Sequence, residues 1–214
     1  MLLWIGVGAA VILILLGLVY KRSQGKVIIT LGPSTNDSPD HVTIGDVQYA
    51  SNYIRLTDAQ GIGKKGVIGW QLNPGSKWKA TFSFRFTPSV KTTLDDGILF
   101  RVFGVENTTA PDWAFKDGTV FYYSFSDSSV SIRVGGKTKK TKTSSVIDGN
   151  WHDVELKYDS KRLTCKIDNV LLLDQSGPEN DESGPWVSVG SWNHNDSTTG
   201  SANHDVKNIV VTQY

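Results

Sequence analysis

Residues 81–86 read Thr81-Phe82-Ser83-Phe84-Arg85-Phe86, a strict alternation of polar side chains and phenylalanine. Successive side chains of a β-strand point to opposite faces, so this pattern puts all three Phe rings on one face. The stretch therefore predicts a strand whose apolar face belongs to a protein core.

Similar short strands fill the chain from residue 42 onward, and no stretch after Tyr20 shows sustained helical periodicity. Turn residues separate the strands, and Asp168-Asn169, for example, predicts a tight turn. The predicted strands include residues 97–103, 119–125, 130–134, 154–158, 163–167, 170–173 and 206–211. Many short strands with Gly, Asn, Asp and Pro turns indicate an all-β sandwich or barrel.

The start of the chain has a different character, because residues 2–20 form one uncharged apolar run. As an α-helix this run would span roughly 28 Å, close to the hydrocarbon thickness of a bilayer. Trp4 and Tyr20 stand near its ends, where amphipathic aromatic side chains favour the headgroup layer, and Lys21 and Arg22 follow at once. The sequence predicts one N-terminal transmembrane α-helix in residues 1–22, with the lipid bilayer as its partner.

Two other structures compete with a membrane anchor at this run. A cleaved signal peptide has a positive start, a shorter apolar core and a small-residue exit, whereas residues 18–21 read LVYK. A buried core helix of this length without a polar face would be unusual in a domain of this size. The anchor is the favoured interpretation.

The orientation of the anchor follows from charge. The nearby Lys and Arg residues all come after the apolar run, so residues 21–214 are expected on the cytosolic or interior side, for which a virion membrane is one setting. The single cysteine, Cys165, agrees, because no intramolecular disulfide can form. Sequons at Asn36, Asn107 and Asn195 point the other way, although chains rich in Asn, Ser and Thr generate them by chance.

Residues 23–41 contain Gly, Pro and small polar residues and predict a linker, in which residues 27–31 could form a short strand or lie along the membrane-facing side of the domain. One globular domain is expected in residues 42–214. The formal net charge of +1 argues against a nucleic-acid-binding protein, which usually carries a concentrated basic excess. The one basic cluster, residues 137–142 (KTKKTK), is predicted to be a solvated hairpin tip. A contact with anionic lipid or an acidic partner is the alternative for this cluster.

The strand patterns of residues 42–214 resemble those of concanavalin A-like domains, which include L-type lectins and laminin G-like domains. The shared features are a Leu-Thr strand, a Gly-rich turn, a strand of alternating Phe, an Asp-Gly strand start and a Trp-His strand. The residues that carry the resemblance are 54–57, 61–70, 82–86, 95–100, 150–159, 163–168, 187–190 and 204–211. The resemblance implies a two-sheet antiparallel sandwich (jelly roll), and it leaves the activity open because this fold hosts lectins, glycanases, scaffolds and adhesion modules.

The resemblance also implies a sugar contact, and it shows where the metal ligands of a lectin would stand in this sequence. In L-type lectins the Asp of the Asp-Gly strand start contacts sugar, and Asp96 before Gly97 matches it; a plain turn is the alternative. Lectins of the legume type hold Ca²⁺ and a transition metal on a Glu-x-Asp strand, and hard cations need several converging oxygens. The matching strand, residues 120–127, has no Glu and only Asp127, so no metal and no other cofactor is expected.

Enzymatic activity is not predicted. Glycanases of this fold need two carboxylates alternating along one strand. Asp95 and Asp96 would face opposite sides of a strand, and the acidic residues of 179–182 lie in a loop flanked by Gly and Pro, which cannot fix their geometry. The four histidines show no metal-ligand spacing.

The tryptophans give the remaining indication of function. Trp113, Trp186 and Trp192 are expected in or near loops, where such rings stack on sugars or anchor protein contacts, whereas Trp151 is assigned to the core. Residues 192–194 are the best candidate for a contact loop, and Trp rings that plug the ends of the sandwich are the alternative. The candidate contact residues are Asp96, Gly97, Trp113, Trp192, Asn193 and His194.

Two functions remain open from the sequence. In the first, the chain is a structural protein whose sandwich docks to a protein partner or lattice, for example a minor capsid protein that links a viral inner membrane to the capsid shell. In the second, it is a membrane-tethered carbohydrate-binding module with a glycan as its partner. The missing metal ligands and the absence of a disulfide favour the structural role.

Overall fold

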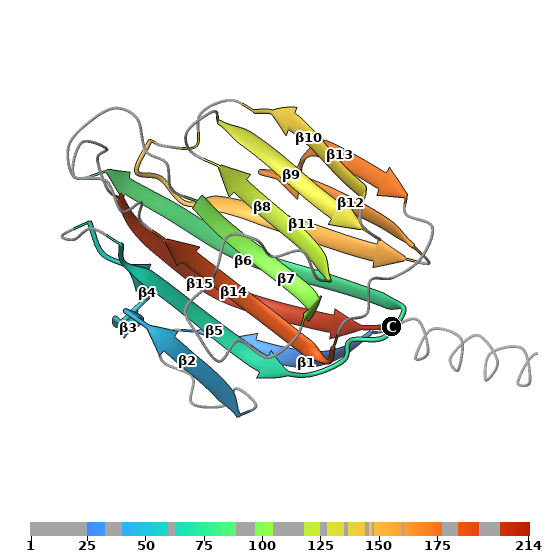
Figure 1. Ribbon diagram of the computed structural model, residues 1–214, viewed down its shortest axis with the longest axis horizontal. Coiled ribbons are helices and arrows are strands. Elements are labelled where there is room, and N and C mark those ends of the chain that lie inside the picture. Colours follow the sequence, from blue (N-terminus) through green and yellow to red (C-terminus); the bar gives the residue numbers. More distant parts are fainter. Residues whose placement is uncertain are drawn as a thin grey trace, which may run out of the picture.

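The chain folds into strands that stack in two layers, as the computed structural model shows (Figure 1). The structure describes residues 25–32, 40–59, 63–88, 97–104, 118–124, 128–134, 137–143, 146, 148–159, 161–176, 184–192 and 202–214. The strands are β1 (Lys26–Leu31), β2 (His41–Gly45), β3 (Gln48–Tyr49), β4 (Ile54–Thr57), β5 (Lys65–Gln71), β6 (Lys77–Pro88), β7 (Gly97–Gly104), β8 (Thr119–Ser124), β9 (Ser129–Val134), β10 (Lys137–Lys142), β11 (His152–Asp159), β12 (Arg162–Ile167), β13 (Val170–Ser176), β14 (Trp186–Trp192) and β15 (Ala202–Gln213).

The two layers are antiparallel sheets, so the predicted sandwich is confirmed. Sheet A has the order β13-β12-β11-β6-β15-β4-β3, and β1 also pairs with β15. Sheet B has the order β10-β9-β8-β7-β14-β5-β2. Strands distant in sequence, such as β7 and β14, lie side by side, so residues far apart along the chain share one surface.

The alternating stretch that opens β6 confirms the predicted strand and its core face. Phe82, Phe84 and Phe86 are buried, while Arg85 points to the other side of sheet A. The ring of Phe82 stacks on Phe100 of sheet B with centroids 5.5 Å apart, so the Phe face of β6 joins the two sheets.

The predicted anchor lies outside the described residues, as do Trp4, Tyr20, Lys21 and Arg22. Within the part of the chain that is described, no helix is long and apolar enough to cross a membrane.

Two segments differ from their predicted roles. Within the predicted linker, β1 pairs with β15 and buries Ile29 and Leu31, so the sandwich includes residues that precede residue 42. The basic segment of residues 137–142 is not a hairpin tip, because it forms β10, the edge strand of sheet B, paired along its whole length with β9. Lysine on an edge strand discourages pairing with a further chain.

The hairpin between β12 and β13 confirms the predicted tight turn. Asp168 and Asn169 have φ values of 50° and 64°. Positive φ at both central residues is the geometry of a two-residue hairpin turn, and Asn and Asp tolerate it better than most residues.

Three polar side chains join the sheets inside one end of the sandwich. Thr57 Oγ1 of β4 lies 2.6 Å from Nδ1 of His204 on β15 and 3.2 Å from Oγ of Ser191 on β14. All three residues are fully buried, and burial lowers the pKa of His204 to about 3 despite a hydrogen bond with the backbone of Ala202. His204 is therefore neutral at physiological pH.

The thiol of Cys165 is expected to be inert in the folded protein. Cys165 is buried in the core, and desolvation raises the pKa of its thiol to about 12, so almost no thiolate forms at neutral pH. We expect no reaction with Ellman's reagent in buffer and one reacting thiol per chain in concentrated guanidinium chloride. Rapid reaction of the native protein would contradict this placement of β12.

Candidate functional site

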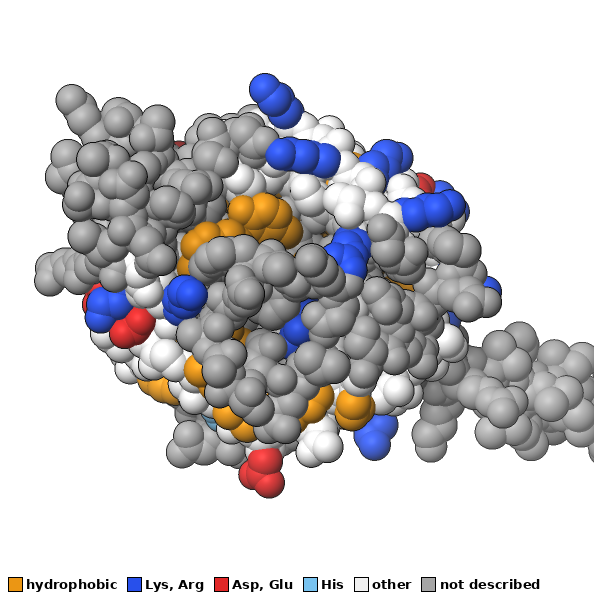
Figure 2. Space-filling view, viewed as in Figure 1, with side chains coloured by type: hydrophobic (Ala, Val, Ile, Leu, Met, Phe, Trp, Pro, Cys, Tyr) orange, Lys and Arg blue, Asp and Glu red, His pale blue; other side chains and the backbone are white. Residues whose placement is uncertain are grey.

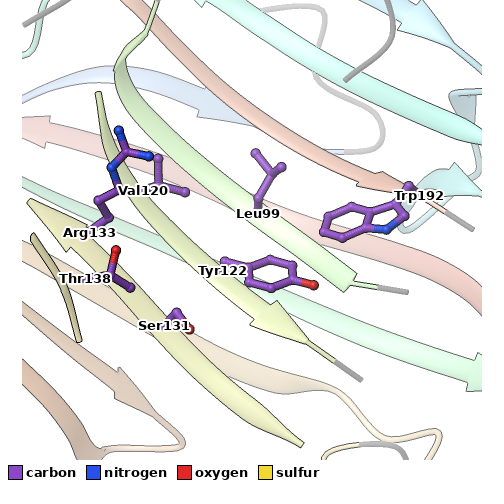
Figure 3. A pocket seen from close by; sticks show the side chains of 7 residues that line it. All are labelled: Leu99, Val120, Tyr122, Ser131, Arg133, Thr138 and Trp192. Atoms are coloured by element: carbon purple, nitrogen blue, oxygen red, sulfur yellow. The ribbon is translucent and has the colours of Figure 1, made fainter. Parts of the chain in front are cut away.

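A hollow opens on the outer face of sheet B, on the side away from the core. It encloses about 260 Å³. Its lining comes from five strands and consists of Leu99, Val120, Tyr122, Ser131, Arg133, Thr138 and Trp192. Figure 3 shows these side chains on one side of the sheet, with the two aromatic rings next to each other. We call this site the aromatic hollow.

Strand alternation explains why apolar side chains line this outer face. In β8, Phe121 and Tyr123 face the core, so Tyr122 between them must face outward. The ring of Tyr122 stacks on Trp192 of β14, with centroids 5.1 Å apart and planes 12° apart. Leu99 and Val120 also face outward, yet they are almost completely buried. The hollow thus has an apolar side that is not part of the sandwich core.

The other side of the aromatic hollow is polar. Ser131 and Arg133 come from β9, and Thr138 lies opposite Arg133 in the register of β9 with β10. Lys140 follows two residues after Thr138, so it lies on the same side of β10 and is exposed. Figure 2 shows apolar side chains gathered in a patch on the face turned to the viewer, with Lys and Arg side chains above it.

Two of the predicted contact residues meet at this hollow. Trp192 lines it, and Gly97 of β7 lies beside it, paired with Trp192. A Cβ atom on Gly97 would come within 2.6 Å of the Tyr122 ring and 3.1 Å of the Trp192 ring, so both rings need a glycine here. The other candidates, Asp96, Trp113, Asn193 and His194, lie outside the described residues.

The structure places three tryptophans, and the predicted place of one of them needs correction. Trp186 and Trp192 are the first and last residues of β14, which agrees with their expected position in or near loops, and both face outward from sheet B. Trp151 is not in the core: it is partly exposed next to β11 and lies over Arg85 on the outer face of sheet A. In the Trp-His stretch the residue that faces the core is His152, which packs on Phe84, so Trp151 before it faces outward.

Replacing Gly97 with alanine is expected to separate the two stacked rings. The new Cβ would overlap the Tyr122 ring and the backbone oxygen of Tyr123, and such overpacking costs about 1–3 kcal/mol. Loss of the near-ultraviolet circular dichroism of the rings and a lower midpoint in urea would report it. Gly69→Ala on the same face is the control, because a Cβ there meets only ordinary contacts; equal effects of both changes would contradict the prediction.

His152 forms a second cluster of titratable groups, away from the aromatic hollow. Its Nδ1 lies 2.7 Å from Asp168 Oδ2 and its Nε2 lies 3.0 Å from Asp148 Oδ1. Burial opposes the charge, but the hydrogen bonds with Asp168 and Asp148 outweigh it and raise the pKa of His152. His152 thus connects Asp148 of the 148–150 turn with Asp168 of the β12–β13 hairpin. This is a structural role.

The donor set of the hollow does not suit a metal ion. Among the residues that the structure describes, the lining contains no carboxylate, imidazole or thiol, and hard cations such as Ca²⁺ need several oxygen ligands. Among the described residues no group of three or more His, Cys, Asp and Glu side chains is placed to hold a metal ion. The expected absence of a metal stays a prediction.

The sequence of this region matches a known domain family. The laminin G domain matches residues 90–205, more than half of the chain. The chain belongs to the laminin G domain family. The matched part runs from β7 to β15 and so includes every strand that lines the aromatic hollow. Curated protein sequences gave no match.

Several solved structures of lectins and carbohydrate-recognition domains share this fold. The exoplasmic/lumenal domain of VIP36 in a Ca²⁺-bound form matches with a TM-score of 0.69 at 18% identity, over 88% of this chain and 90% of that one. Lectin II from Ulex europaeus matches with a TM-score of 0.63 at 17% identity, over 83% and 94%. The carbohydrate-recognition domain of Emp47p matches with 0.61 at 14%, over 89% and 94%. At these identities the likeness establishes the fold, a concanavalin A-like lectin sandwich.

Proposed function

We propose that this chain is a non-enzymatic carbohydrate-binding module, tethered to a membrane by residues 1–22, that holds a glycan in the aromatic hollow. The observation that carries the proposal is the stacked pair of Tyr122 and Trp192 at the apolar side of an open hollow. Sugars present C–H faces that pack on aromatic rings and hydroxyls that need hydrogen-bond partners. Ser131, Arg133 and Thr138 supply those partners across the hollow.

The hollow suits reversible binding better than catalysis. No lining residue is a carboxylic acid, so the pair of acids that glycoside hydrolysis requires is absent from the described lining. The strands hold the rings and the polar groups at fixed positions, and a preorganised site loses little side-chain entropy when a ligand binds.

The fold supports this function over docking to a capsid lattice. The likeness to carbohydrate-recognition domains is one argument, and a form of VIP36 was solved with Ca²⁺ and Man3GlcNAc. No described feature points to a virion. Attachment to a membrane and an interior location for the sandwich remain part of the proposal, supported by the apolar run of residues 2–20 and the basic residues that follow it.

A glycan array tests the proposed function. The full chain in phosphatidylcholine nanodiscs is expected to bind a defined set of glycans, and Tyr122→Ser should weaken that signal at least about tenfold because the stacking surface is lost. Tyr214→Ser removes an exposed tyrosine that follows β15 of sheet A and does not line the hollow, and it is the matched control. Asp96→Asn tests the sugar contact that the family resemblance implies. A folded chain that binds no glycan, or a signal that Tyr122→Ser leaves unchanged, would refute the proposal.

A further inference from the structure

A histidine at one end of sheet A lies between two carboxylates from separate segments of the chain. Asp148 belongs to the turn of residues 148–150, which precedes β11, and Asp168 belongs to the tight turn between β12 and β13. His152, the first residue of β11, has Nδ1 2.7 Å from Asp168 Oδ2 and Nε2 3.0 Å from Asp148 Oδ1. Its ring is largely buried and packs on Phe84, with the ring centroids 5.8 Å apart.

Both contacts of His152 are hydrogen bonds only when the imidazole carries two protons. The pKa of Asp148 is lowered, first by hydrogen bonds from Asn150 and then by the bond with His152, so this carboxylate is ionised. An ionised carboxylate accepts hydrogen bonds and donates none, and a neutral imidazole has one N–H and one lone pair. In the neutral ring, one nitrogen would therefore direct its lone pair at a carboxylate oxygen, which is a repulsive contact. The observed geometry is that of the imidazolium.

The surroundings of His152 also favour the charged ring. Carboxylates come from the turn, from its own strand and from the hairpin: Asp148, Asp153 and Asp168. From the core, β6 presents the uncharged ring of Phe84, and the ring of Tyr123 in sheet B lies behind it, with centroids 5.9 Å apart. The cations of Arg85 and Lys207 lie over Trp151 on the outer face of sheet A. Among the described residues, the charges that His152 meets are therefore negative.

The two bound carboxylates differ in what else holds them. Asp168 Oδ1 accepts a hydrogen bond from the backbone N–H of Asp153 at 2.9 Å, and the Asp168 N–H donates to the Asp153 carbonyl at 2.9 Å. The hairpin is thus attached to β11 without His152. Asp148 accepts from the backbone N–H and the side-chain amide of Asn150 at 2.8 and 2.9 Å, which lie in the same turn. Among the described contacts of Asp148, the one with His152 is the contact that reaches beyond the turn.

We infer that His152 is a pH-dependent switch that holds the 148–150 turn to the β12–β13 hairpin as the imidazolium and releases the turn when the ring loses a proton. The proton on Nε2 passes to water, because Nδ1–H keeps the shorter bond with the better-held Asp168. The bonds between Asp148 and Asn150 keep the shape of the released turn. The switch does not involve the aromatic hollow, so it stands or fails apart from the proposed function.

Nuclear magnetic resonance of the ¹⁵N-labelled full chain in phosphatidylcholine nanodiscs tests the switch between about pH 5.5 and 9.5. The ring nitrogens of His152 should change from imidazolium to the Nδ1–H tautomer with a midpoint above pH 6.5, because the hydrogen bonds with the carboxylates raise the pKa against the effect of burial. The backbone order parameter of Gly149 should fall from about 0.85 to below about 0.6 with the same midpoint. That of Asn169 in the hairpin should stay near about 0.85.

His152→Gln and Asp148→Asn are the test variants, each checked by its melting curve. The order parameter of Gly149 should no longer change with pH in either variant, because glutamine does not titrate and the asparagine amide can both accept from the imidazolium and donate to the neutral ring. His41→Gln is the matched control, since Nε2 of His41 lies 2.8 Å from the Tyr49 hydroxyl rather than from a carboxylate. It should leave the transition unchanged.

Three results would overturn the switch. The first is a midpoint of His152 at or below pH 6.5, because the carboxylates would then not hold the proton. The second is an order parameter of Gly149 that stays constant with pH in the wild type, or a transition that persists in His152→Gln. The third is a simultaneous loss of order along β11, because the whole strand and not the turn would then respond to the proton.

Discussion

Replacing Asp205 with alanine is expected to lower the free energy of unfolding by about 3–5 kcal/mol. The carboxylate is fully buried and is the shared partner of Arg55 and Arg85. Without it, two guanidinium groups would lie side by side at the surface of sheet A with no counter-charge between them. Removing one partner of a buried ion pair costs far more than the pair itself contributes, since the two remaining charges are only partly exposed to water.

Urea unfolding followed by far-ultraviolet circular dichroism measures this effect. The control is Asp159→Ala, which removes an exposed partner of Lys77 and should cost less than about 1 kcal/mol. If the two variants lost similar stability, the ion pairs of Asp205 with Arg55 and Arg85 would contribute no more than exposed surface pairs.

The second large effect is a loss of stability at acid pH that comes from His204. Burial lowers the pKa of His204 from 6.5 to about 3, so the unfolded state binds a proton more readily than the folded state between these values. Stability is therefore complete above pH 6.5 and falls as the pH drops toward 3. The difference corresponds to up to about 5 kcal/mol, or about 1.4 kcal/mol for each pH unit.

Unfolding free energies measured over this pH range separate His204 from the other groups. His204→Gln should be less stable than the wild type at neutral pH and should have a flatter acid limb. His152→Gln is the contrasting variant, because the pKa of His152 is raised. Its contribution is complete below pH 6.5 and is lost as the pH rises through the folded-state value. An acid limb that His204→Gln leaves unchanged would show that His204 is not desolvated as described.

The sequence predicts the fold well where alternation is strict. The Phe residues of β6 and the alternating pairs in β11 and β12 face the core as expected, because a one-residue shift would turn every apolar side chain of a strand toward water. The edge strand β10 was missed because KTKKTK carries no apolar face, and it is held by backbone pairing with β9 rather than by burial. Strand β1 lies inside the predicted linker, where a short strand over residues 27–31 was one of two alternatives, because so short a stretch does not by itself show whether it pairs with the sandwich.

The candidate site could be predicted only in part. Trp192 and Gly97 were predicted to be contact residues, and both lie at the hollow, but their neighbours in space come from β8, β9 and β10. Pairing between distant strands cannot be read from one sequence. Tyr122 did leave a signal: between Phe121 and Tyr123 it is the aromatic residue with the opposite parity. Trp151 was wrongly assigned to the core, because a large aromatic residue was taken to need burial between the sheets. On the outer face of sheet A, the cations of Arg85 and Lys207 cover its ring instead.

The most direct test of the account is to locate where a glycan binds by nuclear magnetic resonance. The full chain in nanodiscs, labelled with ¹⁵N, is titrated with the strongest glycan from the array. We expect the indole N–H of Trp192 and the backbone amides of Tyr122, Ser131 and Arg133 to shift together and to saturate, while those of sheet A stay in place. Shifts confined to sheet A, or none at a saturating glycan concentration, would contradict the assignment of the aromatic hollow as the binding site.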